Sequence, residues 1–157
     1  FCACMMDVMG IDGKVITIDC EPHWPGVYHK KELINVDGQV VPFDVEELKK
    51  PDHPKIKYIH SDCLEAKFPR MGAKVMVILD CDHSASHVYQ ELEKYSRLVT
   101  PGQYLIVEDT DAYYLEGGGP AGAIKLFLKK NKNFISEKSR EKYGISSNIG
   151  GYLLRIS

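Results

Sequence analysis

The pattern of apolar and polar residues along the chain predicts an alternation of strands and helices. Two short apolar runs, residues 75–79 and 104–107, stop abruptly at the carboxylates Asp80 and Glu108. An apolar run without polar alternation is typical of a strand buried on both faces of a parallel sheet. Between these runs, apolar residues recur at helical spacing, which predicts a helix from about residue 84 to residue 98.

The remaining elements continue this alternation. A first helix is expected over residues 1–9, strands at 15–18, 55–59, 134–135 and 152–156, and a helix over 121–130. Residues 21–54 form a proline-rich, irregular excursion, in which an Asp37-Gly38 turn predicts a small hairpin over residues 34–41. Strands that alternate with helices in 157 residues favour one mostly parallel, doubly wound α/β domain.

Composition and charge exclude some classes of function. The formal net charge is −2, and no basic stripe suggests contact with nucleic acid. No apolar stretch approaches the roughly 20 residues needed to span a bilayer, and the first residues lack the charged region of a signal peptide. The five cysteines are an odd number without a CxxC pair, which favours reduced thiols in a cytoplasmic protein.

The acidic strand ends are the candidate chemistry. Ligands in open α/β sheets bind beyond the carboxyl ends of the strands, and this edge carries Asp80, Asp82, Glu108 and Asp109. Close carboxylates repel one another, and a divalent cation such as Mg²⁺, which prefers oxygen ligands, removes that repulsion. The alternative is a set of helix caps and surface charges. His83 adjoins this cluster and is a candidate proton acceptor or a helix-start hydrogen-bonding residue.

The strand at residues 15–18 ends at Asp19, and the strand at residues 55–59 is followed by Ser61, Asp62 and Cys63. An acidic residue at such a strand end can accept hydrogen bonds from both ribose hydroxyls of a nucleotide-type cofactor. Glu21 is the alternative to Asp19 for this task. For Ser61 and Asp62 the alternative is ordinary turn chemistry, since both residue types bond their own backbone.

Several of these segments resemble one family in order along the chain. They are Asp80-Cys-Asp-His83-Ser, the helix with Glu91 and Leu92, Pro101-Gly102-Gln-Tyr104, Val107-Glu108-Asp109-Thr110, Gly119-Pro120 and Gly151-Tyr152-Leu153-Leu154-Arg155. Together they resemble the cephalosporin hydroxylase and rhamnosyl O-methyltransferase family, within the class I S-adenosylmethionine-dependent methyltransferases. The resemblance runs from about residue 15 to the C-terminus and is weakest across the excursion.

The resemblance implies a Rossmann-like sheet with strand order 3-2-1-4-5-7-6. On that template residues 15–18 are strand 2, 56–59 strand 3, 75–79 strand 4 and 104–107 strand 5. Strand 1 and its glycine-rich turn would precede residue 1, so we expect the chain to be an N-terminally truncated domain whose own activity is open. Loss of a central strand exposes sheet edges, which favours aggregation.

The resemblance also implies cofactors and site residues. Asp19 would hold the ribose of S-adenosylmethionine, and Ser61, Asp62 and Cys63 would contact its adenine ring. Mg²⁺ would be bound by the acid after strand 4 and by Glu108 and Asp109. Asp80 aligns best with the first of these, although Asp82 can replace it. His83 would remove the proton from a substrate hydroxyl.

The expected function is therefore Mg²⁺-assisted, S-adenosylmethionine-dependent O-methylation of a hydroxyl on a sugar, glycolipid or secondary metabolite. The expected partners are a small-molecule or glycan substrate and, as is common in the family, a second copy of the chain. A nucleotide-binding oxidoreductase on a similar sheet and a non-catalytic interaction domain or inactive remnant are the alternatives. Hydroxylation ranks low, because no 2-His-1-carboxylate pattern is visible.

Overall fold

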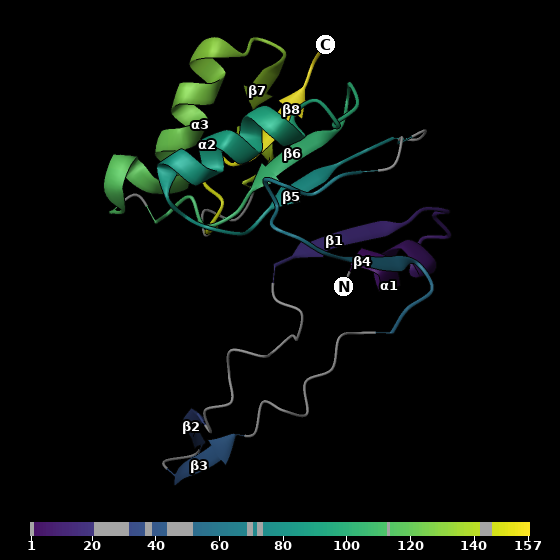
Figure 1. Ribbon diagram of the computed structural model, residues 1–157, viewed down its shortest axis with the longest axis vertical. Helices are drawn as coiled ribbons and strands as arrows, with labels where there is room; N and C mark the ends of the chain where they lie inside the picture. Colours follow the sequence, from purple (N-terminus) through teal and green to yellow (C-terminus); the bar gives the residue numbers. More distant parts are fainter. Residues whose placement is uncertain are drawn as a thin grey trace. The chain divides into compact units, whose positions relative to one another are not determined.

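The computed structural model describes residues 2–20, 32–36, 39–43, 52–68, 71, 74–112, 114–141 and 146–157. The chain divides into two compact units, Phe1–Ala66 and Lys67–Ser157. The first unit contains two two-stranded sheets and the second a four-stranded sheet, and each unit is described by itself below (Figure 1). The expectation of a single domain stays a prediction.

The first unit contains a parallel pair of strands. Helix α1 (Cys2–Val8) leads into β1 (Val15–Asp19), and β1 pairs in parallel with β4 (Ile56–His60). Val15 lies opposite Ile56 at one end and Asp19 opposite His60 at the other. Both strands therefore finish at the same edge.

An ionic cluster ties the end of α1 to the start of β4. The Asp7 carboxylate lies 2.7 Å from Lys55 Nζ and 3.0 Å from His53 Nε2. Lys55 Nζ also donates to the backbone carbonyl of Ile11. Because the Asp7 side chain is 50% exposed, the cluster contributes little to stability.

The predicted hairpin within the excursion is confirmed. Strand β2 (Glu32–Val36) pairs antiparallel with β3 (Gln39–Phe43), and Val36 lies opposite Gln39. The predicted Asp37-Gly38 turn itself lies outside the described residues, as do residues 21–31 and 44–51 of the excursion.

The second unit is built on a mixed four-stranded sheet. Its strands, in the order in which they neighbour one another, are β5 (Val77–Leu79), β6 (Tyr104–Val107), β8 (Tyr152–Arg155) and β7 (Phe134–Ser136). β5 and β6 run parallel, whereas β8 is antiparallel to both of its neighbours. This is the 4-5-7-6 part of the order implied by the resemblance, and β1 with β4 is the 2-3 pair.

Helix α2 (Ala85–Tyr95) connects β5 to β6, and α3 (Gly119–Lys130) connects β6 to β7. Short 3₁₀ turns at Glu116–Gly118 (η2) and Lys138–Arg140 (η3) flank α3 and β7. The two α-helices lie against each other on one side of the sheet (Figure 1). A helix between β5 and β6 is the connection that parallel neighbours require.

Several element boundaries differ from the predictions, and two of the differences have a clear physical cause. β5 is shorter than the apolar run because Val75 bonds to Thr100 rather than to the ladder, through its amide and through its carbonyl. α3 begins two residues before the predicted start, since Pro120 occupies its first turn, where a missing N–H costs nothing.

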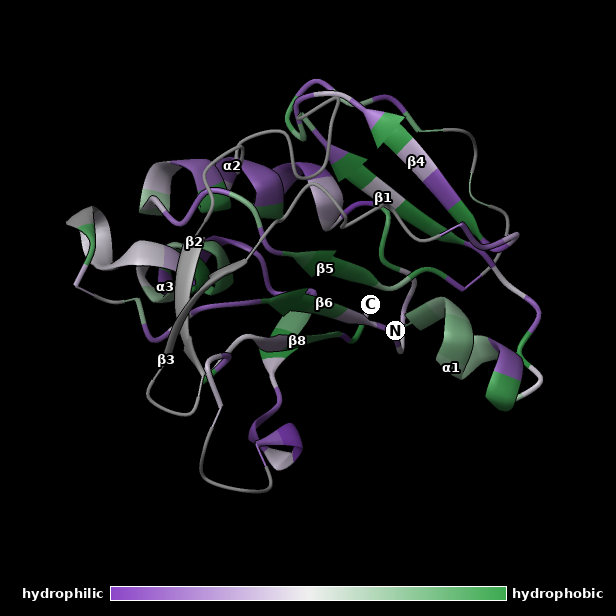
Figure 2. Cartoon of the chain, turned by 90° about the horizontal axis from the view of Figure 1, so that it is seen from below, coloured by the Kyte–Doolittle hydropathy of each residue, from purple (hydrophilic) through white to green (hydrophobic). Residues whose placement is uncertain are grey.

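The core of the second unit lies between the helices and the sheet, and Figure 2 shows the strands β5 and β6 as mainly hydrophobic. The helices contribute side chains spaced by three or four residues, and the strands contribute Leu79, Leu105, Val107 and Leu153. From the helices come Val88, Leu92, Tyr95, Ala123, Ile124 and Phe127. At ~25 cal/mol per Å² of apolar surface, burial of these side chains is the main stabilising contribution.

Candidate functional site

The carboxyl ends of β5 and β6 meet at one edge of the second sheet. Leu79 lies opposite Val107 in the parallel register, so Asp80 and Glu108 are the first residues past the ladder on each strand. The Glu108 amide donates a 3.0 Å hydrogen bond to the Leu79 carbonyl. The sheet therefore delivers the two acidic strand ends side by side, as their apolar runs predicted.

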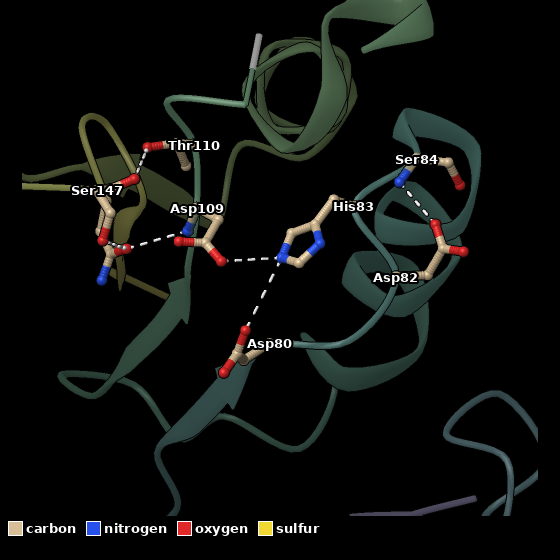
Figure 3. Close-up of polar contacts among 8 residues, drawn as sticks. Asp80, Asp82, His83, Ser84, Asp109, Thr110 and Ser147 are labelled. Carbon is tan, nitrogen blue, oxygen red and sulfur yellow. Dashed lines mark hydrogen bonds and ion pairs between the residues drawn. The ribbon is translucent and has the colours of Figure 1, made fainter. Parts of the chain in front are cut away.

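Three side chains converge at this edge. His83 Nε2 lies 3.0 Å from Asp109 Oδ2 and 3.9 Å from Asp80 Oδ1. One potential ligand atom from each residue falls within 4.8 Å of those of the other two. Figure 3 shows the imidazole between the two carboxylates. Nε2 is buried and has no well-aligned hydrogen bond, so its contact with Asp109 is electrostatic.

Asp82 is not part of this group. Its Oδ1 accepts a 2.6 Å hydrogen bond from the Ser84 amide, which lies at the start of α2, away from the other carboxylates (Figure 3). Hydrogen bonds from the Ser84 side chain and backbone lower the pKa of Asp82. Asp82 thus performs the helix-start role that was the alternative to metal binding, and its place as a ligand stays a prediction.

Glu108 also lies outside the group of Asp80, His83 and Asp109, but the charges of Asp80 and Asp109 affect its pKa. Burial raises the pKa of Glu108, and the negative charges of Asp80 and Asp109 raise it further. The ionised carboxylates at this edge therefore repel one another. A divalent cation compensates such an excess.

A glycine-rich turn holds the backbone near His83. Gly117, Gly118 and Gly119 all have positive φ, and a Cβ on Gly119 would lie 2.4 Å from the carbonyl oxygen of Ala112. The backbone thus passes too close for any side chain at Gly119. This is the turn role of the Gly-Gly-Gly-Pro segment rather than evidence for an anion site.

The segment before β8 supplies contacts that the sequence did not reveal. Asn148 Oδ1 accepts a 3.2 Å hydrogen bond from the Asp109 amide, and Thr110 Oγ1 donates to the Ser147 carbonyl. The only signal available in the sequence was a Ser-Ser-Asn run shortly before the last strand. Because β8 is antiparallel to β6, residues that precede β8 meet those that follow β6.

The cofactor residues predicted in the first unit follow its two parallel strands. Asp19 ends β1, and the Ser61 amide donates a 3.0 Å hydrogen bond to the Asp19 carbonyl. Asp62 Oδ1 accepts from the Leu64 amide at 2.6 Å, which is the turn chemistry named as its alternative. Cys63 is half-buried and, like the other four cysteines, does not form a disulfide. Cofactor binding by these residues stays a prediction.

The residues at the edge of the second sheet fit a divalent cation. Carboxylate oxygens suit Mg²⁺ or Mn²⁺, and imidazole is accepted by Mn²⁺ and softer ions. The convergence of Asp80, His83 and Asp109, together with the raised pKa of Glu108, supports such an ion on physical grounds. In the described part of the chain, none of the helices has both the length and the apolar character needed to span a bilayer.

The fold and these strand ends define a mixed α/β protein with an acidic edge at its parallel strands. The sequence matches the family described as rhamnosyl O-methyltransferase/CmcI over residues 1–156. The chain belongs to this family, which confirms the resemblance.

Curated relatives agree with this assignment. Proteins named rhamnosyl O-methyltransferase from Mycobacterium tuberculosis (strain H37Rv) and Mycobacterium bovis (strain BCG) are each 35% identical over 89 residues. A protein of the same name from Mycobacterium leprae is 33% identical over 89 residues. Each match covers 52% of this chain and 36% to 39% of the relative. No solved structure gives a significant match.

Proposed function

We propose that the protein is a divalent-cation-assisted, S-adenosylmethionine-dependent O-methyltransferase. Its acceptor is a hydroxyl on a sugar, glycolipid or secondary metabolite, and the name of its relatives makes a rhamnosyl group the first acceptor to test. The observation that carries the proposal is the convergence of Asp80, His83 and Asp109 beyond the parallel strands of a member of this family.

In this proposal Asp80, Glu108 and Asp109 hold the cation, and Asp19, Ser61, Asp62 and Cys63 hold the cofactor. Asp80 is preferred to Asp82 because the Asp82 carboxylate is already bound to the start of α2. When bound, S-adenosylmethionine supplies an electrophilic methyl group, and the cation lowers the pKa of the acceptor hydroxyl.

In the proposed reaction His83 is the proton acceptor. The hydroxyl proton would pass to His83 Nδ1 as the methyl group is transferred, because His83 Nε2 is buried against Asp109. Asp109 Oδ2, 3.0 Å from Nε2, stabilises the resulting imidazolium. General base catalysis of this kind contributes roughly 10²- to 10⁴-fold to rate.

Calorimetric titration with S-adenosylmethionine, with and without Mg²⁺, tests the assignment on wild type, Asp19→Ala and Glu108→Ala. We expect Asp19→Ala to abolish cofactor binding, and Glu108→Ala to remove only the response to the cation. Asp12→Ala and Asp111→Ala are matched controls, because both residues are exposed acids outside the proposed sites.

Two outcomes overturn the proposal. If wild type binds neither ligand, a non-catalytic interaction domain becomes the better assignment. If wild type binds a nicotinamide dinucleotide in place of S-adenosylmethionine, a nucleotide-binding oxidoreductase becomes the better assignment. Where both ligands bind, mass spectrometry of a rhamnose-bearing acceptor incubated with the protein shows whether a methyl group is added.

A further inference from the structure

Asp109 has an unusual backbone conformation. Its φ is +50°, and among the described residues it is the one non-glycine with positive φ. The left-handed region brings Cβ close to a carbonyl oxygen and is unfavourable for an L-residue, although Asp and Asn tolerate it best. A conformation of this kind persists only where neighbouring groups hold it, and such sites often carry function.

The Asn148 side chain holds this conformation. Its Oδ1 accepts from the Asp109 amide at 3.2 Å and from Ser147 Oγ at 3.1 Å. Two donors converge on that one atom, so it must be the amide oxygen and not the nitrogen. The backbone amide of Asn148 in turn donates to Ser146 Oγ, and the backbone carbonyl of Asn148 accepts from the Gly151 amide. Asn148 is therefore fixed by its own segment before it contacts Asp109.

The whole segment of residues 146–151 is bound to both sides of Asp109. On one side the Val107 amide donates to the Gly151 carbonyl at 3.0 Å. On the other, the Ser147 carbonyl accepts from Thr110 Oγ1 at 2.9 Å and from the Asp111 amide at 3.3 Å. A Cβ on Gly151 would lie 2.2 Å from the Val107 carbonyl oxygen, so only glycine permits this approach.

We propose that Asn148 is a positioning residue: its hydrogen bond to the Asp109 amide keeps Asp109 left-handed and so aims its carboxylate at His83 and Asp80. A change in φ swings Cβ about the N–Cα bond, and would therefore carry Oδ2 away from the 3.0 Å contact with His83 Nε2. This role rests on the proposed function, because the Asp109 carboxylate that Asn148 orients is one of the proposed ligands of the divalent cation.

The test uses Asn148→Ala with Asn131→Ala as matched control. Asn131 makes the same kind of contact, from Oδ1 to the Asn133 backbone amide at 3.0 Å, but at the end of α3. The first readout is hydrogen exchange of the Asp109 amide by NMR. The second is the Kd for Mn²⁺ alone, measured by calorimetry and by the EPR signal of free Mn²⁺.

In Asn148→Ala we expect the Asp109 amide to exchange about tenfold faster or more. We expect Mn²⁺ affinity to fall by about 10- to 100-fold, as is typical when a residue that orients a metal ligand is lost. Asn131→Ala leaves both quantities unchanged. Asn148→Asp, which keeps an acceptor oxygen at the same place, retains amide protection and binds Mn²⁺ at least as tightly as wild type.

The outcomes separate the two proposals. If wild type binds Mn²⁺ and Asn148→Ala binds it equally well, the positioning role is overturned and the proposed function stands. If wild type does not bind Mn²⁺, the proposed function loses its cation and the inference fails with it. Should Asn148→Ala not fold, Asn148→Asp decides, because loss of Asp109 amide protection in that variant contradicts the assigned bond.

Discussion

At the scale of single residues, two acids only two positions apart have different surroundings. Asp80 lies near His83 and Asp109 at the end of β5, whereas Asp82 accepts a hydrogen bond from the Ser84 amide at the start of α2. The difference comes from the turn between strand and helix, which directs the first carboxylate to the sheet edge and the second to the helix.

This difference predicts opposite phenotypes for two alanine variants. Asp82→Ala should lower the free energy of unfolding by about 0.5–1.5 kcal/mol, since the Ser84 amide loses its partner, and should leave Mn²⁺ affinity within about threefold of wild type. Asp80→Ala should leave stability nearly unchanged and weaken Mn²⁺ binding by tenfold or more. Urea unfolding and calorimetry measure both. The reverse pattern would make Asp82 the ligand.

Glu137 provides a pH-dependent prediction. Its carboxylate accepts from the Tyr104 hydroxyl and from Ser139 Oγ, with Arg140 nearby, and these contacts lower its pKa below the ordinary 4.5. Because the folded pKa lies below the unfolded one, the contribution to stability is complete above pH 4.5 and is lost as pH falls through the folded pKa. The free energy of unfolding of Glu137→Gln should therefore fall less steeply below pH 4.5.

Urea unfolding of wild type and Glu137→Gln at a series of pH values measures this difference. Tyr104→Phe should show part of the same effect, since the Tyr104 hydroxyl is the largest cause of the lowered pKa. If the free energy of unfolding falls equally steeply below pH 4.5 in wild type and Glu137→Gln, the hydrogen bonds to Glu137 do not contribute to stability in solution.

At the scale of elements, one arginine joins the last strand to the end of a helix. Arg155 on β8 donates from Nη1 to the carbonyls of Val99 at 2.5 Å and Ser96 at 3.3 Å, just beyond α2. Carbonyls after the last helical turn lack partners inside the helix, and a cation there is favourable. The C-terminal Gly-Tyr-Leu-Leu-Arg segment thus has a structural task in this chain.

Arg155→Lys keeps the charge but loses the planar guanidinium, in which Nη1 reaches both carbonyls while Nε donates to the Ser157 carbonyl. We expect the free energy of unfolding to fall by about 1.5 kcal/mol, the usual value of a hydrogen bond to a charged group. Arg97→Lys is the matched control, because Arg97 is exposed. Equal midpoints for the two variants in urea unfolding would show that a lysine at position 155 stabilises the chain as well as the guanidinium does.

At the scale of the whole molecule, the two compact units differ in how much structure supports their strands. β6 and β8 are paired along both edges within a four-stranded sheet that two helices accompany. β1 and β4 form a two-stranded sheet. Two-stranded sheets have little stability of their own.

Hydrogen exchange followed by mass spectrometry should therefore show a gradient along the chain. Peptides from β6 and β8 should exchange slowest, close to the rate set by global unfolding, and peptides from β1 and β4 should exchange faster. Equal protection in the two sets would mean that the units unfold as one cooperative structure.

The sequence alone predicted the elements and the candidate chemistry. Apolar runs ending at acids located β5 and β6, because an interior strand must be apolar and its polar successors must leave the sheet. Short strand-like segments ending at Asp19 and His60 located β1 and β4. The family motifs identified the membership that the comparison confirms. The exact boundaries of the elements did not follow from the sequence, since local contacts such as that between Val75 and Thr100 decide where a ladder stops.

Only the tertiary structure decided which side chains meet. Asp80, Asp82, Glu108 and Asp109 look equivalent in the sequence, but the turn before α2 withdraws Asp82. Asn148 stands 39 residues from Asp109 along the chain, and only the antiparallel pairing of β8 with β6 brings them together. Residue type and periodicity report what each segment buries. They carry no information about the register between distant strands, which sets every contact at this edge.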